Sequence, residues 1–191
     1  ASQPWEGQSI GQPSARRRRD GTVEVFYAGA LGIGRAAEQA GVFVAEPEPV
    51  LTHDAVPFAD GPPHSPAIVE LPDGELLLFF TVEIAGRQAI GRSRSADGVL
   101  WLTDPVPVLT AGPSGSLDDL GVSAPSAVVG EMASGRGVLY VYFLTRASDG
   151  KDRIGMAASF LGAELLEKSP AAMYAPISGV LLDQPSVLRF D

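Results

Sequence analysis

Cysteine is absent from this sequence of 191 residues. Disulfide bridges, thiolate metal ligands and a cysteine nucleophile are therefore excluded, and thiol redox chemistry indicates no compartment. No apolar run approaches the roughly 20 residues that a membrane-spanning helix needs. The first eleven residues are polar and lack the apolar core of a signal peptide. We therefore expect no membrane span, and these absences leave the localisation open.

Positive charge is also scarce, since 14 basic residues stand against 23 acidic ones and the net charge is −9. A chain of this charge is repelled by phosphate backbones, so we expect no nucleic-acid partner. Hydrophobic residues make up 45% of the sequence, which is enough for a buried core. The 22 glycines and 16 prolines indicate many turns between short elements and favour an all-β protein.

The sequence repeats one pattern, a proline followed by a small residue and, in most copies, an apolar run. The pattern starts at Pro13, Pro66, Pro125 and Pro185, so successive starts are 53, 59 and 60 positions apart. A fixed period of this length is typical of repeat architectures.

Each of the first three units then shows the same order of expected strands. Aromatic-rich strands are expected over 23–27, 76–80 and 138–143, glycine-containing third strands over 32–36, 89–93 and 153–157, and fourth segments over 42–50, 99–108 and 164–174. An Asp-Gly pair precedes the second strand in two units, and such a pair between alternating apolar residues is a strong hairpin signal. The unit is therefore predicted to be a four-stranded antiparallel sheet.

We predict a β-propeller, because four-stranded units bury their faces by packing against one another around an axis. Residues 1–191 would form one partial propeller domain, with blades at about 8–52, 62–110 and 120–176 and the first strand of a further blade at 180–191. Closed propellers have about four to eight blades. We therefore expect a fragment, or a chain that closes the ring with a second chain or with its own copy.

The second unit contains the sequence motifs that are most specific to a known family. Its Leu77–Phe80, Ile90–Ser93 and Ser95–Trp101 segments, with Pro107–Leu109 and the following Asp119–Ser126, resemble the five-bladed propeller glycoside hydrolases, the group of arabinanases, xylosidases, levansucrases and invertases. The resemblance implies a carbohydrate-active protein that binds or hydrolyses an oligosaccharide in its central channel without a cofactor. It also favours a secreted or periplasmic compartment. A non-catalytic scaffold or protein-interaction module is the alternative.

Glycosidases need two carboxylates across the scissile bond, and the resemblance implies that one is an Asp directly before the proline of an innermost strand. The corresponding residues here are Gln12, Ser65, Ala124 and Gln184, none of them acidic. Asp183 lies one residue further back, on the opposite face of a regular strand unless a bulge intervenes. Glu83 and Asp119 are the other catalytic candidates. Their alternative roles are an exposed charge and a turn residue.

Arg16 to Arg19 form the one run of like charge. On a strand this run alternates, so Arg17 and Arg19 could enter the channel and bind the carboxylate of an acidic sugar. Glu70 and Trp101 are further substrate-binding candidates. The alternatives are a solvated hairpin end for the arginines and packing between blades for Trp101, with Asp97 capping the preceding turn.

Histidine is nearly absent, and the two histidines flank a proline-rich loop. His53 and His64, with Asp54 and Asp60 between them, have no recognisable metal-ligand spacing, so no metal site is predicted. No glycine-rich phosphate loop and no serine in a nucleophile-elbow context are present.

Overall fold

A computed structural model describes residues 3–176 and 182–187 of the chain. The strands are β1 (Gly11–Arg17), β2 (Val23–Gly29), β3 (Gly32–Gln39), β4 (Val42–Ala45), β5 (Leu51–Thr52), β6 (His64–Glu70), β7 (Leu76–Ile84), β8 (Arg87–Ser95), β9 (Leu102–Thr103), β10 (Gly121–Glu131), β11 (Gly137–Arg146), β12 (Asp152–Phe160) and β13 (Glu167–Lys168). Two 3-10 turns, η1 (Pro4–Glu6) and η2 (His53–Ala55), complete the described elements. Among these elements no helix is long and apolar enough to cross a membrane.

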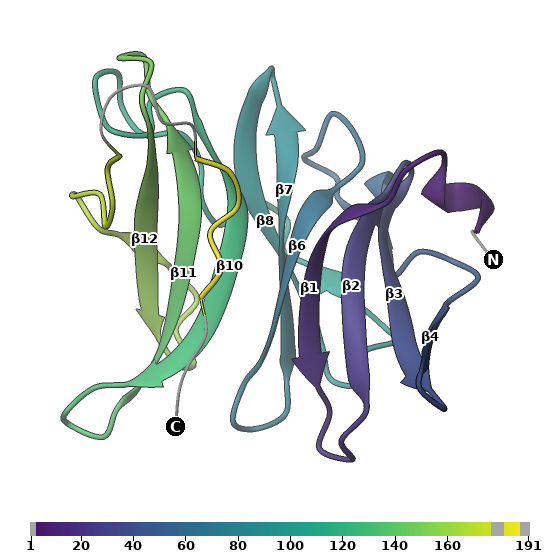
Figure 1. Cartoon of the computed structure of the whole chain (residues 1–191). Helices are drawn as coiled ribbons and strands as arrows, with labels where there is room; N and C mark the ends of the chain where they lie inside the picture. The colour runs from purple at the N-terminus through teal and green to yellow at the C-terminus, as the bar shows by residue number, and fades with distance from the viewer. Residues whose placement is uncertain (1–2, 177–181, 188–191) are drawn as a thin grey trace.

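The strands form three antiparallel blades that stand side by side (Figure 1). The strand orders are β1-β2-β3-β4 in blade 1, β6-β7-β8-β9 in blade 2 and β10-β11-β12-β13 in blade 3. Blades 2 and 3 also meet through one parallel pairing, between Gly121 and Gln88. The predicted all-β fold of four-stranded blades is confirmed.

The core lies in the two seams between neighbouring blades. In the first seam Phe26 and Ile33 of blade 1 pack against Leu78 and Phe80 of blade 2. In the second seam the alternate residues of blade 2 pack against blade 3, and Phe79, Ile90, Leu139, Val141 and Phe143 belong to this cluster. Successive side chains of a strand point to opposite faces. Blade 2 can therefore fill both seams, which explains the uninterrupted apolar run at the start of β7.

The fourth strands are shorter than the sequence pattern predicts. Regular pairing covers only Val42–Ala45, Leu102–Thr103 and Glu167–Lys168. Prolines at 47, 49, 105, 107 and 170 follow these strands, and proline cannot donate a hydrogen bond to a sheet. After them the chain returns to the third strand, where Leu51 pairs with Ile33, Leu109 with Ile90 and Tyr174 with Ile154.

Residues 182–187 lie beside β10, where the innermost strand of a further blade is expected (Figure 1). The backbone N–H of Val187 donates to Ser126 Oγ at 3.0 Å. In the same way Ile68 N–H donates to Ser14 Oγ at 3.1 Å between the innermost strands of blades 1 and 2. The contact recurs at the repeat interval, but residues 182–187 form no regular strand, so the further blade remains a prediction. Predicted residues 180–181 and 188–191 lie outside the described residues.

Candidate functional site

Each innermost strand contains a bulge directly before its proline. The pairing register shifts between Gly11 and Ser14, between His64 and Ala67, and between Ser123 and Ser126. In each case two residues of the innermost strand oppose a single residue of its partner, which re-aims the side chains at that point. From the sequence, a bulge is considered only as the condition that would turn Asp183 to the other face of its strand. The structure has a bulge at the same repeat position in all three described blades.

The residue before the proline has a left-handed backbone in each of the three blades. Its φ is 55° at Gln12, 48° at Ser65 and 48° at Ala124. Such a conformation costs roughly 1–2 kcal/mol for a residue other than glycine. Strain of this kind is typical of binding and catalytic positions, and here it marks the position where the resembled hydrolases would carry an aspartate.

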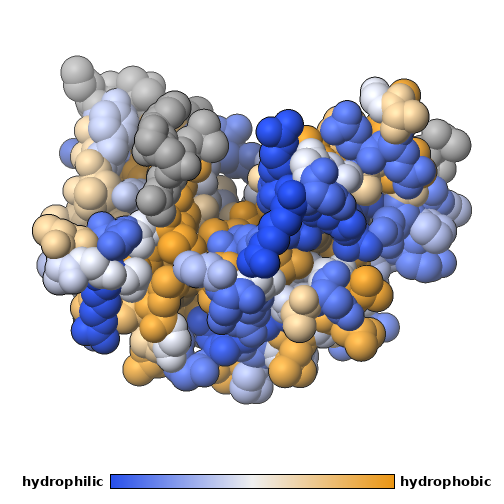
Figure 2. All heavy atoms as spheres, turned by 90° about the horizontal axis from the view of Figure 1, so that it is seen from below, coloured by the Kyte–Doolittle hydropathy of each residue, from blue (hydrophilic) through white to orange (hydrophobic). Residues whose placement is uncertain are grey.

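The four proline segments converge on one cavity of about 680 Å³. The segments that line it are 13–15, 65–70, 124–129 and 184–187, so every described innermost strand contributes. Seen from below, the molecule is hollowed along one side, with strongly hydrophilic side chains on one wall of the hollow (Figure 2). This cavity is the described part of the central channel. Glu70 is the one carboxylate among its lining residues.

Uncharged polar groups gather where β1 and β6 begin. Ser65 N–H donates to Gln12 Oε1 at 3.0 Å, and His64 Nδ1 lies 3.0 Å from Ser65 Oγ. Burial lowers the pKa of His64, while the carboxylate of Glu83 acts in the opposite direction. The imidazole is therefore neutral at pH 7. His64 and Gln12 also line a second cavity of about 400 Å³, beside Gln8 and Glu6.

Asp119 is held as a structural acceptor. Its carboxylate accepts from Ser148 N–H at 2.7 Å, from Ser148 Oγ at 2.7 Å and from Gly115 N–H at 2.8 Å. The hydrogen bonds from Ser148 and Gly115 lower the pKa of Asp119. In blade 2 Asp60 lies at the equivalent distance before its proline and accepts Ala85 N–H at 2.6 Å. Both aspartates tie the chain before an innermost strand to the β-hairpin of the same blade.

The other two catalytic candidates are exposed. Glu83 lies on β7 near enough to His64 to affect its pKa. Asp183 precedes Gln184, which lines the central cavity, but Asp183 does not line it. The structure therefore brings Glu83 close to His64 and holds Asp119 in a turn. A catalytic role for the three residues remains a prediction.

Strand β1 ends at Arg17, and most of the arginine run is used in ion pairs. Arg16 donates to Glu24 at 2.7 Å and to Glu70 at 2.7 Å, and Arg18 also bonds Glu24. Arg19 Nε lies 3.3 Å from Glu70. Two predicted substrate-binding residues, Arg19 and Glu70, thus contact each other.

Arg17 is exposed, and within the described residues its side chain forms no ion pair. It lies on β1 opposite Val23. Its predicted substrate-binding role remains a prediction.

Trp101 packs between blades. Its ring meets Phe26 of blade 1 edge to face, with centroids 5.9 Å apart. The preceding turn is held by Asp97, which accepts Val99 N–H at 2.8 Å and Leu100 N–H at 2.9 Å. These contacts agree with the packing and capping alternatives, and a substrate-binding role for Trp101 remains a prediction.

The histidine loop holds no metal-like cluster. His53 Nε2 lies 2.9 Å from the carbonyl of Ala59. Within residues 3–176 and 182–187, no group of three or more His, Asp or Glu side chains is placed to hold a metal ion.

Two buried carboxylates were not singled out as site residues by the sequence reasoning. Glu24 is fully buried among three arginines. Glu6 is 5% exposed and accepts the hydroxyl of Tyr27 at 2.6 Å. Burial and the charge of Glu6 raise the pKa of Tyr27. Glu6 lies in η1, before the first strand rather than in it.

Comparison with known proteins relates the fold to solved structures. No protein-family model and no curated protein matches the sequence. Among solved structures, a member of the GH130 family of mannoside phosphorylases, described as containing glycoside hydrolases that target β-1,2 mannosidic linkages in Candida mannan, has a TM-score of 0.65 at 19% identity. A thermostable family-43 glycoside hydrolase has a TM-score of 0.64 at 12% identity.

The chain has the fold of the β-propeller glycoside hydrolases. A GH43_1 enzyme from Xanthomonas citri, solved with xylotriose, agrees at a TM-score of 0.59 and 14% identity. The chain is covered at 91%, 92% and 86% in these three comparisons, whereas the solved chains are covered at 54%, 56% and 54%. The chain therefore spans about half the length of its structural neighbours, in agreement with a partial propeller.

Proposed function

We propose that this chain belongs to a carbohydrate-active propeller protein and that its half of the central channel binds a glycan. The observation that carries the proposal is the convergence of four innermost-strand segments on one cavity of about 680 Å³. Ser65 lines that cavity, and its N–H donates to the amide oxygen of Gln12. Uncharged groups of this kind pair with sugar hydroxyls through hydrogen bonds.

Hydrolysis requires more than this binding surface. Two carboxylates must lie about 5–10 Å apart across the scissile bond. None of the four positions before proline is acidic, so any hydrolytic pair would use other carboxylates. Glu83, Asp119 and Asp183 are the candidates in this chain. The contacts of Asp119 make Glu83 the better candidate, because Asp119 uses both carboxylate oxygens within its own turn.

We propose that further blades, from a second chain or a second copy, close the ring. Trp5 stacks on Tyr27 of blade 1, with centroids 5.6 Å apart. Phe58 stands at the equivalent place before Pro66 and packs in the closed seam between blades 1 and 2. Trp5 therefore occupies the position of a residue that packs between two blades. It lies on the outer face of blade 1, where the described residues provide no neighbouring blade.

A glycan array followed by calorimetry tests the binding proposal. We expect the chain to bind at least one neutral oligosaccharide. Ser65→Ala should weaken that binding about three- to tenfold, the effect of one lost hydrogen bond. Ala124 shows that the repeat accepts alanine in this conformation. Ser114→Ala, at an exposed serine away from the channel, is the matched control.

The alternative function is a non-catalytic scaffold, favoured by the absence of an acidic residue before the four prolines. If the chain is a scaffold, no glycan on the array should bind to it, and Ser65→Ala should not change its interactions with other proteins. A glycan hit whose affinity is equal in the wild type and Ser65→Ala would also contradict channel binding.

A further inference from the structure

The two blade seams contain an equivalent arginine in different surroundings. The backbone carbonyl of Arg35 accepts Glu46 N–H at 2.9 Å, that of Arg92 accepts Asp104 N–H at 3.0 Å, and that of Met156 accepts Ser169 N–H at 2.8 Å. The three residues therefore occupy one repeat position, on β3, β8 and β12. By the same register Glu24 corresponds to Leu77, and Arg16 to Val69.

In the first seam the guanidinium of Arg35 is fully engaged. Its Nε and Nη2 bind Glu46, and its Nη1 donates to the carbonyl of Gly98 at 2.7 Å. The same Nη1 lies 3.5 Å from the buried carboxylate of Glu24. Every nitrogen of this buried cation has an acceptor.

In the second seam one nitrogen of Arg92 has no acceptor. Its Nε donates to Asp104 at 2.7 Å, and its Nη2 lies 2.6 Å from Asp104 and 3.4 Å from the carbonyl of Glu164. Within the described part of the chain, Nη1 of Arg92 donates no hydrogen bond. The carboxylate that lies near Arg35 Nη1 has no counterpart at Arg92, because Leu77 replaces the glutamate.

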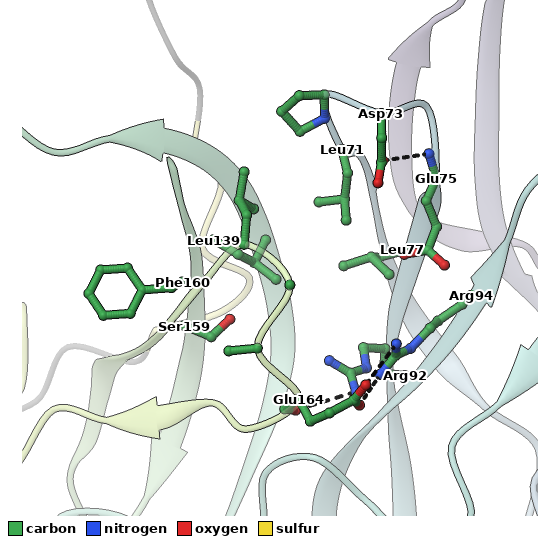
Figure 3. A pocket seen from close by; sticks show the side chains of 14 residues that line it. Leu71, Asp73, Glu75, Leu77, Arg92, Arg94, Leu139, Ser159, Phe160 and Glu164 are labelled. Carbon is green, nitrogen blue, oxygen red and sulfur yellow. Dashed lines mark hydrogen bonds and ion pairs between the residues drawn. The ribbon is translucent and has the colours of Figure 1, made fainter. Parts of the chain in front are cut away.

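A cavity of about 220 Å³ occupies this place between blades 2 and 3. The side chain of Arg92 is only 5% exposed and forms part of its lining. Figure 3 shows the two guanidinium groups of Arg92 and Arg94 together at one end of the pocket. The apolar wall consists of leucines from both blades, namely Leu71, Leu77, Leu139 and Leu161. Replacement of a charged pair by Leu77 and Val69 has left room here.

The opposite rim of the pocket is acidic. Asp73 and Glu75 stand on the turn between β6 and β7; Asp73 lies away from the arginines, whereas the side chain of Glu75 extends towards Arg94 and its charge helps to raise the pKa of Arg94 (Figure 3). Arg94 is already paired with Glu164, whose carboxylate also lies 3.5 Å from Nη2 of Arg92, so Nη1 is the nitrogen of Arg92 that remains for a ligand. A multiply charged anion would be repelled by the rim, whereas a carboxylate directed at Arg92 and an ammonium directed at Glu75 would satisfy both ends.

We propose that this pocket binds a small zwitterionic amino-carboxylate with an aliphatic side chain. The carboxylate accepts from Nη1 of Arg92, the ammonium faces Asp73 and Glu75, and the aliphatic group packs on the leucines. The volume is below the roughly 300–1,000 Å³ of pockets for drug-sized ligands, which suits a molecule of amino-acid size. The proposal is independent of glycan binding in the channel.

Calorimetric titration of the 191-residue chain with L-leucine tests the site. Arg92→Met should weaken binding at least tenfold, because it removes a charge-assisted hydrogen bond. Methionine occurs at the same repeat position in blade 3, so this change is compatible with the fold. Arg35→Met is the matched control and should leave the affinity for L-leucine within twofold, although it also removes a buried seam arginine.

Two further measurements separate the parts of the ligand. Glu75→Gln should weaken binding of L-leucine severalfold but leave or improve binding of 4-methylpentanoate, which lacks the ammonium group. Leu77→Glu should abolish binding, because it restores at Arg92 the carboxylate that Arg35 has. No heat of binding with millimolar L-leucine, or equal effects of Arg92→Met and Arg35→Met, would overturn the proposal.

Discussion

Glu24 is a buried carboxylate whose charge is held by arginines. Burial is the largest influence on its pKa and acts to raise it, but Arg18 and Arg16 together lower the pKa below its ordinary value. A carboxyl group with a lowered folded-state pKa stabilises the protein above its unfolded pKa. That stabilisation is lost as the pH falls through the folded pKa.

Glu24→Gln should therefore destabilise the chain by about 3 kcal/mol at pH 7, because removal of one partner leaves buried charge unpaired. Urea unfolding measures this difference, which should shrink below the ordinary Glu pKa of about 4.3. Glu48→Gln, at an exposed glutamate, should have almost no effect. A Glu24→Gln difference that stays constant between pH 7 and pH 3 would disagree with this assignment.

Gly34 makes room for Trp5. A Cβ atom at this glycine would lie 1.9 Å from Cη2 of Trp5, so a side chain cannot be added without moving the indole. Gly34→Ala should displace Trp5, shift its fluorescence to longer wavelength and cost about 1–3 kcal/mol from overpacking. Gly61→Ala is the control, since nothing lies within 4 Å of its added Cβ. Unchanged fluorescence in Gly34→Ala would mean that Trp5 does not stack there.

Single residues also show how far sequence reasoning reaches. The turn role of Asp97 and the packing role of Trp101 follow from local chemistry, and the contacts agree with both alternatives. The burial of Glu24 could not be predicted in this way. Its arginine partners include Arg35, eleven positions away, and only the fold brings them together.

The innermost strand is the element that forms the channel. Its bulge places a left-handed residue before each proline, and the N–H of Ala124 donates to Thr81 Oγ1 of blade 2 at 2.9 Å. β-branched residues tolerate this conformation poorly. Ala124→Val should therefore destabilise the chain by about 2 kcal/mol or more. Ala15→Val, on the exposed face of β1, should cost less than about 0.5 kcal/mol.

Equal unfolding free energies for these two variants would show that the bulge is not strained.

Sequence repetition predicts the innermost strands because each begins with a proline and a small residue. It does not predict their bulges, because a bulge depends on pairing with the next strand. The short fourth strands likewise follow from the prolines after Ala45 and Thr103, once the effect of proline on sheet pairing is considered.

The whole molecule has open apolar faces at both ends of the blade row. Phe43 is 54% exposed and lines a cavity of about 610 Å³ on the outer face of blade 1. Met132, Tyr140, Met156 and Leu165 line another of about 490 Å³ on blade 3. Exposed apolar surfaces of this kind mark interfaces. The corresponding faces of the three blades lose charge along the chain, from Glu24 and Arg35 to Leu77 and Arg92 and then to Tyr140 and Met156.

Phe43→Lys should reduce association of the chain without weakening its fold. We expect light scattering to show a mass above that of one chain at high concentration, and a shift towards one chain in Phe43→Lys. The unfolding free energy should change by less than about 0.5 kcal/mol, because the side chain is half exposed. A wild-type chain that stays monomeric at all concentrations would contradict the role of this face as an interface.

The fold of the whole molecule could be predicted from its repeat, whereas its chemistry could not. The period locates three blades because each must bury two faces, and the solved neighbours agree with that architecture. The second seam pocket had no sequence signal, since Arg92 and Leu77 look unremarkable until compared with Arg35 and Glu24 in the folded seams.

Backbone NMR of the isotope-labelled chain during titration with a glycan from the array is the most direct test of channel binding. We predict that the amide shifts that change most belong to Gln12, Ser65 and Ala124, at the start of the three innermost strands. Shift changes confined to the outer strands, or none at saturating glycan, would contradict the assignment of the central channel as the binding site.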